Sequence, residues 1–328
     1  MYLRTCSIIA QAANGQTLDV SFLRCRFQIK QHNVMTPQRA TIKITNQNPS
    51  TAKLFVTPNA EFTTVTIMAG YEDDGSNGVL FSGNIVQAIY GRENPTDTLT
   101  QILASDGHQG HNYGVVNKSL AAGSTPMDHV NAAVAAMSQY GMSLGTIGAS
   151  LGGLASPVYP RGVALYGMAR DVLANIAKSK GADLSYQAGV INMLGPADNL
   201  PGAPVLLNSQ TGLIGLPTQE VGGIMARSLI NTNIKVGGLI QIDQGDIQGL
   251  LQGVNADGSS NVDLNANNPV LAPGQIVADG IYKVYRIDID GDTRGNPWYM
   301  DIAALPVGQA PTSASIAARG GLGNAVGQ

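Results

Sequence analysis

The stretch that decides the fold covers residues 208–243 and reads NSQTGLIGLPTQEVGGIMARSLINTNIKVGGLIQID. It is a series of short β-prone runs separated by glycines. The pair Gly222-Gly223 predicts a hairpin, because two residues with easy access to positive φ reverse a strand pair at little cost. Strands are expected over residues 224–230 and 239–243. The stretch holds no nucleophile, metal cage or phosphate cradle, so it predicts a structural framework.

Glycine and proline also mark where these strands end. Gly212 and Gly215 flank the first apolar run, and Pro217 is expected to stop it. Residues 231–235 are expected to form a loop, and the glycine pair at 237–238 a turn. In the strand that follows, one side is expected to be formed by Leu239, Gln241 and Asp243 and the other by Ile240 and Ile242.

A first β domain is expected over residues 1–116. Apolar and polar residues alternate over residues 22–30, which is typical of a strand with one buried and one wet face. The pair Asn14-Gly15 predicts a hairpin that joins this strand to the one before it. In order, the expected strands cover residues 3–10, 22–30, 39–45, 63–69, 79–90 and 98–105. This series of antiparallel strands predicts a small barrel or sandwich.

A small α+β domain with two helices is expected over residues 117–202. Residues 125–128 (Thr-Pro-Met-Asp) predict a helix start, because a hydroxyl caps the helix, proline suits its first position and an acid its first turn. A second helix is expected over residues 165–179, ended by Gly181. The other expected features are a hairpin of residues 184–187 and 190–194 across Ala188-Gly189, and a loop over residues 141–160 that packs against a neighbour.

A second β domain is expected over residues 203–305, ending in a hairpin of residues 282–290 and 298–305. Residues 244–280 are polar and too many for an ordinary connection, which predicts a loop that contacts a partner. Residues 306–328 are expected to be a flexible tail. The sequence therefore predicts an α+β, mainly β fold with two antiparallel β domains and a small α+β domain between them. No sequence repeat relates the two β domains.

The composition favours a protein that is buried in an assembly. Only 12% of the residues are charged, against about 25% in a typical globular protein. The net charge of −3 argues against a protein that wraps nucleic acid, which needs a basic stripe for the phosphates. A slightly acidic balance suits a channel through which DNA slides without sticking.

The cysteines and the apolar runs bear on the compartment. Cys6 and Cys25 are the only cysteines, and we expect free buried thiols rather than a disulfide framework. The first residues lack the order of a signal peptide, and no run reaches the ~18 apolar residues of a membrane span. The sequence predicts synthesis in the cytoplasm and no stable insertion into a membrane.

One motif imitates a hydrolase. Residues 148–152 (Gly-Ala-Ser-Leu-Gly) fit the G-x-S-x-G pattern around a nucleophilic serine, which needs a histidine later in the chain. All the histidines precede Ser150; they are His32, His108, His111 and His129. We therefore interpret the motif as a loop of small residues.

Two further clusters could bind a metal. His108 and His111 could do so with Asp106 or His129, but the surrounding glycines predict a loop that lines an interface. Carboxylates at every second residue, Asp288, Asp290 and Asp292, resemble the start of a calcium loop. The glycine at the sixth place and the glutamate at the twelfth are missing, being Thr293 and Tyr299. The alternation predicts a strand with the acids on its wet face. Since the other carboxylates are scattered, the sequence predicts no catalytic residue, cofactor or metal.

Several runs resemble the second barrel of baseplate hub proteins from contractile-tailed bacteriophages. They are TGLIGLP at residues 211–217, SLIN at 228–231, IKVGGLIQID at 234–243, GIYKV at 280–284 and GDTRGNPWY at 291–299. The resemblance implies two tail-tube-like β domains that duplicate one structure, and no catalysis. In the last run it implies structural roles for Asp292, Arg294 and Trp298, as turn, salt bridge and aromatic anchor.

The same resemblance implies an assembly. Three copies would form a ring in which the two barrels alternate, so that threefold symmetry matches a hexameric tail tube. The ring would join the tube, or a tube-initiator protein, to the central spike and other baseplate proteins in the virion, after assembly in the host cytoplasm. Its channel would pass the tape-measure protein and then DNA in transit. Contacts are expected from residues 141–160, 244–280 and the tail. The alternatives are a tube initiator, the hub of a phage-derived injection machine, and a tail-associated lytic enzyme.

Overall fold

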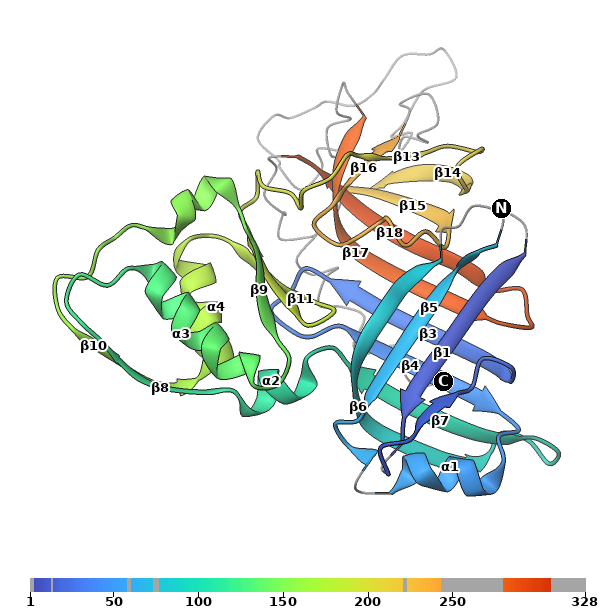
Figure 1. Cartoon of the computed structure of the whole chain (residues 1–328). Helices are drawn as coiled ribbons and strands as arrows, with labels where there is room; N and C mark the ends of the chain where they lie inside the picture. Colours follow the sequence, from blue (N-terminus) through green and yellow to red (C-terminus); the bar gives the residue numbers. More distant parts are fainter. Residues whose placement is uncertain are drawn as a thin grey trace, which may run out of the picture.

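The computed structural model describes residues 3–12, 14–57, 60–72, 77–220, 223–242 and 280–307. Most of its strands belong to one 13-stranded sheet, in which neighbours are antiparallel except for β13 and β16 (Figure 1). The strands of its first half are β1 (Arg4–Gln11), β2 (Thr17–Asp19), β3 (Arg24–His32), β4 (Arg39–Thr45), β5 (Thr64–Tyr71), β6 (Gly78–Arg92) and β7 (Thr98–Ser105). Those of the second half are β13 (Val205–Leu207), β14 (Leu213–Glu220), β15 (Gly223–Leu229), β16 (Leu239–Ile242), β17 (Ile281–Asp292) and β18 (Trp298–Pro306). The predicted mainly β fold is confirmed.

Helices and small sheets stand beside this large sheet (Figure 1). Helix α1 (Pro49–Val56) packs against β6. The remaining elements make up what we call the α+β unit: α2 (His108–Tyr113), β8 (Val115–Leu120), α3 (Pro126–Ser138), β9 (Ser143–Ile147), η2 (Ala149–Leu154), β10 (Val163–Met168), α4 (Ala169–Ser179), β11 (Asp183–Gln187) and β12 (Val190–Leu194). This unit has its own hydrophobic core.

The large sheet runs without a break from one half of the chain to the other. Its strand order is β14-β15-β18-β17-β3-β4-β7-β6-β5-β1-β2, and β16 with β13 branches from β17. The seam between the halves is the pairing of β17 with β3, where Ile289 lies opposite Ile29. One hydrophobic core contains side chains from both sides of this seam. The division at residues 116, 202 and 305 stays a prediction.

The period-two patterns produce the expected strands. β4 and β7 have the predicted bounds. β3 buries Cys25, Phe27 and Ile29 and turns the residues between them toward solvent. β14 pairs with β15 up to Glu220 opposite Gly223, which confirms the predicted hairpin. Both cysteines are free thiols.

The Asn14-Gly15 turn joins different strands from those expected. Gly15 has φ +81°, and the turn pairs β1 with the short strand β2, which the sequence pattern does not predict. The expected pairing with residues 22–30 is wrong, because β3 lies between β4 and β17. β2 has only three residues, too few to show a period.

The predicted helix caps are confirmed, but the predicted start of one helix is wrong. The Thr125 side chain accepts the Asp128 amide, and the Asp128 carboxylate accepts the Thr125 amide in return, so α3 begins with a capping box. Gly181 (φ +61°) follows α4 as predicted. The predicted start at residue 165 is wrong: α4 begins at Ala169, because residues 163–168 pair with β8 as strand β10.

One predicted loop and one predicted strand end are wrong. The expected loop at 141–160 holds β9, which pairs with β12, and the 3-10 helix η2. Pro217 does not stop its strand but lies inside β14, where the register with β15 shifts between Ile214 and Thr218. Proline is tolerated there because β14 is an edge strand.

The remaining expectations concern the ends of elements. The predicted final hairpin is confirmed by β17 and β18, and β18 continues through Pro306. The expected contact loop at 244–280, except for Gly280, lies outside the described residues, as do residues 308–328 of the expected tail. No helix among the described residues is long and apolar enough to cross a membrane.

Candidate functional site

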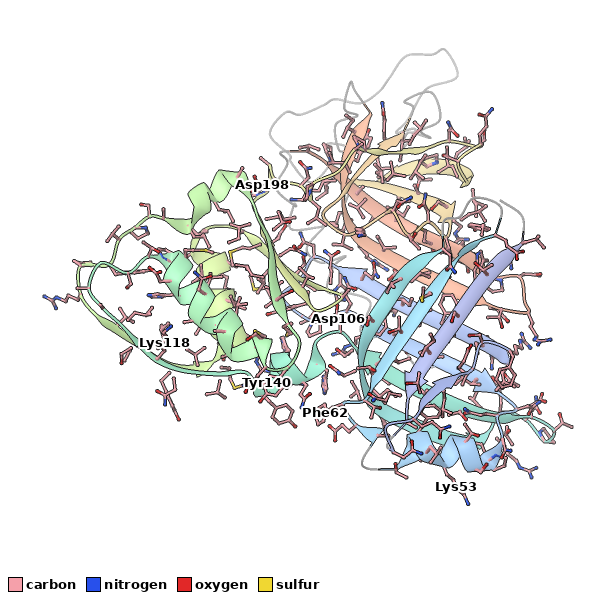
Figure 2. The ribbon with its side chains drawn as sticks, viewed as in Figure 1. Lys53, Phe62, Asp106, Lys118, Tyr140 and Asp198 are labelled. Atoms are coloured by element: carbon pink, nitrogen blue, oxygen red, sulfur yellow. The ribbon has the colours of Figure 1, made fainter. Side chains whose placement is uncertain are left out.

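Ser150 of the hydrolase-like motif has a structural partner instead of a histidine. Its Oγ donates to Asp198 Oδ2 at 2.5 Å, and its amide donates to Asp198 Oδ1 at 2.9 Å. The amide of Gly195 donates to the same carboxylate at 2.9 Å. A Cβ on Gly148 would stand 1.9 Å from Asp198 Oδ2, so the glycine permits this approach. The motif therefore ties η2 to the turn after β12, next to the labelled Asp198 in Figure 2.

The histidine pair lies on a helix, so the predicted loop at residues 106–111 is wrong. α2 begins after Gly107 and carries His108 and His111 one turn apart. His108 stacks on Phe62, with ring centroids 5.8 Å apart, and His111 meets the edge of Tyr186 at 5.3 Å. Burial lowers the pKa of both imidazoles. Within the described parts of the chain, no group of three His, Cys, Asp or Glu residues could hold a metal ion.

Asp106 joins the sheet to the α+β unit. It follows β7 and is labelled in Figure 2. Its side chain is 1% exposed and accepts a hydrogen bond, 2.8 Å long, from the amide of Gly189 at the tip of the β11–β12 hairpin. Nearby, Asn33 donates to Asp183 at 2.6 Å and Gln187 donates to the carbonyl of Val236 at 2.8 Å. Burial raises the pKa of the Asp106 carboxyl to about 6.

Asp106→Asn is expected to remove a pH dependence of stability. Since the folded-state pKa lies above the ordinary value of 3.8, the folded state binds more protons, and wild-type stability falls as pH rises from about 4 through about 6. Asparagine can still accept the Gly189 amide but does not ionise. The free energy of unfolding of the variant minus that of wild type should therefore rise across this range, by up to about 3 kcal/mol. Urea unfolding of both proteins at pH 4.5 to 7.5 measures it. A difference that does not change with pH would contradict the role of Asp106.

The three alternating aspartates lie on β17, as the strand prediction requires, and each has a protein partner. The expected wet face is wrong for Asp292, which is buried at the seam. Asp288 pairs with Arg286. Asp290 accepts from Gln28 at 3.1 Å on the neighbouring strand β3. Asp292 accepts from Arg24 Nη2 at 2.7 Å. Two of these contacts cross the seam, so the acids hold the halves together.

The turn between β17 and β18 also faces the seam. Arg294 donates from its side chain to the carbonyl of Phe22 at 2.7 Å and from its amide to Asp292 at 3.0 Å. The salt bridge expected of Arg294 is wrong, because Arg294 has no ion pair among the described residues; Asp292 pairs instead with Arg24, across the seam. Trp298 is fully buried beside Phe27.

The two halves of the sheet repeat one arrangement. The first half has the order β3-β4-β7-β6, and β6 continues into the pairing with β5. The second half has the order β14-β15-β18-β17, and β17 continues into the pairing with β16. Each strand of the first set thus has a counterpart in the second: β3 with β14, β4 with β15, β7 with β18, and β6 with β17.

Irregularities support this correspondence. The register of β6 with β7 shifts between Ile85 and Gln87, and that of β17 with β18 shifts between Val284 and Arg286. Counted from these shifts, Ile89 of β6 corresponds to Asp288 of β17. A shared irregularity at one place in two ladders indicates duplicated geometry rather than chance.

Among the described residues, the duplication leaves two edges without a neighbouring strand. In the first half β3 is covered by β17, whereas its counterpart β14 has only β15 beside it within the described residues. The outer edge of β17 is covered by β3, whereas the same part of β6, residues 86–92, pairs with no described strand other than β7. Unpaired edges of this length are templates for another strand.

Apolar side chains are exposed on both free edges. Ile89 on β6 is 52% exposed, and Ile214 and Leu216 on β14 are 40% and 61% exposed. Exposed apolar groups beside unpaired backbone are a feature of surfaces that another chain covers. We name residues 86–92 the β6 edge and β14 the β14 edge. Sequence reasoning missed both, since they are defined by which neighbours are absent.

Comparisons with known proteins place the fold. No family model and no curated protein matches the chain. The 43 kDa tail protein of prophage MuSo2 from Shewanella oneidensis has a similar structure, with 10% identity and a TM-score of 0.53 over 91% of this chain and 97% of that one. A tail protein of Neisseria meningitidis MC58 matches with 9% identity and a TM-score of 0.55 over 94% and 98%.

A third similar structure is an Escherichia coli component of the type VI secretion system, described as structurally similar to the T4 bacteriophage tail proteins gp27 and gp5. It matches with 10% identity and a TM-score of 0.50 over 95% of this chain and 80% of that one. At these identities the likeness concerns the fold alone. The chain therefore has a mainly β, antiparallel fold that it shares with phage tail proteins.

Proposed function

We propose that the protein is a structural virion protein, the baseplate hub of a contractile phage tail, and that it acts as a ring of three copies. The observation that carries the proposal is the duplicated sheet with corresponding free edges. Within one chain β17 pairs with β3; between chains the counterparts, the β6 edge and the β14 edge, would pair in the same way. Each copy then contributes two equivalent sheets, and three copies give the pseudo-sixfold ring that suits a hexameric tail tube.

The seam inside the chain supplies the register of the pairing between chains. Asp288 lies opposite Lys30 there. Ile89 corresponds to Asp288, as counted above. Glu220 corresponds to Lys30, because their partners, Gly223 on β15 and Arg39 on β4, hold corresponding positions in the two ladders. The proposed interface thus sets Ile89 opposite Glu220 and continues with Tyr90 opposite Gln219. This pairing covers the backbone and the exposed isoleucine together.

The ring would line its channel with the wet face of the continuous sheet. On that basis the hub joins the tail tube or its initiator to the central spike, contacts other baseplate proteins, and passes the tape-measure protein and then DNA. It needs no catalytic residue. The type VI neighbour favours one second candidate, the hub of a phage-derived injection machine, in which the same ring would serve.

Light scattering on a sizing column tests the ring. The expected mass at high concentration is three times the 34.0 kDa of one chain. The fraction of this species should rise with concentration, because the edges bind by mass action. A stable dimer would overturn the proposal, since two copies leave one pair of edges uncovered. A chain that stays monomeric at its highest soluble concentration would contradict self-assembly without a template.

A further inference from the structure

The corresponding strands of the two halves of the large sheet carry opposite net charge. The strands β3, β4, β7 and β6 hold no acidic residue, and their basic residues are Arg24, Arg26, Lys30, Arg39, Lys43 and Arg92. The corresponding strands hold the acids Glu220, Asp288, Asp290, Asp292 and Asp301 with the bases Arg227, Lys283 and Arg286. The net charge of −3 for the whole chain hides this separation.

Like charges face one another on the first of these sheets. Lys30 lies directly opposite Arg39, and Arg26 lies directly opposite Lys43, on the wet face of β3 and β4. Like charges directly opposite each other in a ladder destabilise the pairing. Between these two pairs of cations lies the pair Gln28 and Thr41, whose neutral side chains can form hydrogen bonds. We name the four charged residues with Arg24 the basic stripe.

Much of this charge has no ion-pair partner in the part of the chain that the structure describes. Arg24 pairs with Asp292, and Arg26 pairs with Glu93 at 2.5 Å. Among the described residues, Lys30, Arg39 and Lys43 make no ion pair. Lys30 and Arg39 are exposed and Lys43 is half-buried. The stripe therefore presents three cations that form no ion pair among the described residues, although Asp288 of β17 lies directly opposite Lys30.

A hollow of about 280 Å³ lies in the stripe between Arg26, Lys43, Gln28 and Thr41, with Asp290 and Asp292 on the opposite wall. Its floor includes Phe27 and Gly291, where a Cβ on Gly291 would stand 2.1 Å from the Phe27 ring. The side that β4 forms thus offers cations and neutral donors, and the side that β17 forms repels anions. An anion in the hollow would be drawn toward β4.

We propose that the basic stripe binds the phosphate backbone of double-stranded DNA. From Arg24 to Lys30 a strand spans about 20 Å, a length over which a duplex presents about a dozen charges. Arginine, lysine, glutamine and threonine side chains are usual phosphate contacts. The wet faces of β3 and β4 carry no exposed aromatic ring, so they lack the stacking platform that favours single strands.

The choice of DNA as the natural polyanion rests on the proposed hub function, but the stripe itself belongs to a single chain. In a ring of three, three stripes alternate with three acidic sheets around the channel. DNA would contact the channel wall at the three basic stripes and be repelled by the acidic strands between them. Such contacts guide a duplex without holding it tightly, and they bind without regard to sequence.

Fluorescence anisotropy of a labelled 20-base-pair duplex tests the stripe. Wild type should bind the duplex, and with about three phosphate contacts its affinity should fall about 40-fold between 50 and 200 mM salt. The variant Lys30→Gln/Arg39→Gln/Lys43→Gln should bind at least about tenfold more weakly at 50 mM salt. The matched control is Lys53→Gln/Lys118→Gln/Lys178→Gln, which loses the same charge from exposed sites on α1, β8 and α4, two of them labelled in Figure 2. The control should bind like wild type.

The outcomes separate this inference from the ring. If both triple variants weaken binding equally, the effect comes from net charge, and the proposal that the basic stripe binds DNA is overturned. If poly-glutamate competes as effectively as unlabelled duplex, DNA is not the preferred ligand of the basic stripe, and an acidic polypeptide replaces it in the proposal. Binding by a monomeric chain that needs the stripe would support the inference even if the ring proposal fails, and a ring that does not bind DNA would overturn the inference alone.

Discussion

Tyr90→Pro is expected to convert the three-copy ring into single chains, with at least about a 100-fold loss of affinity between chains, or about 3 kcal/mol. The reason lies in the direction of the backbone amides on β6. The amide of Glu93 donates to Asp97 on the β7 side at 3.0 Å. Because successive amides alternate, the amide of Tyr90 points to the opposite, unpaired side. Proline removes this donor and leaves the ladder with β7 intact.

Tyr90→Ala is the matched control. It removes the same side chain but keeps the amide, so it should retain the ring. Circular dichroism establishes that both variants are folded, and light scattering gives their masses. A folded Tyr90→Pro protein that still forms the ring would contradict pairing through the β6 edge. A Tyr90→Ala protein that fails as completely would show that the side chain, rather than the backbone, makes the contact.

Much of the fold could be predicted because its signals are local. β4 and β7 show a clean alternation and have the expected bounds. The start of α3 is indicated by the residues of the capping box, Thr125 and Asp128. The boundary of α4 failed for a non-local reason. The segment Val163–Met168 is compatible with either a helix or a strand by its own pattern, and its pairing with Val115–Leu120 decides the outcome.

The candidate site could be predicted far less well. Its two edges consist of unpaired backbone groups, which leave no recognisable pattern of side chains in the sequence. The duplication escaped detection because corresponding positions share geometry and not residue type: Lys43 lies opposite Gln101 in the first sheet, and Arg227 lies opposite Asp301 in the second. The same divergence produces the charge separation. Whole-chain charge argued against a protein that wraps nucleic acid, whereas the fold collects the bases on one surface.

Trp298 is the residue on which the seam depends most. It begins β18 and lies opposite Gly291 of β17, which in turn lies opposite Phe27 of β3. The Trp298 and Phe27 rings meet edge to face, with centroids 5.7 Å apart and an interplanar angle of 74°. The Arg4 guanidinium lies 5.5 Å from the indole centroid. The indole thus contacts both halves of the sheet.

Trp298→Ala is expected to lower the free energy of unfolding by about 3–5 kcal/mol, because it leaves a large cavity where the halves meet. Trp298→Phe should cost much less, about 1–2 kcal/mol. It keeps a ring against Phe27 and deletes the indole Nε1, which is buried and has no hydrogen-bond partner among the described residues. Urea unfolding measures both. If the core is shared as the continuous sheet requires, each variant should still unfold in one transition. Two transitions, or equal losses for alanine and phenylalanine, would show that Trp298 stabilises only its own hairpin.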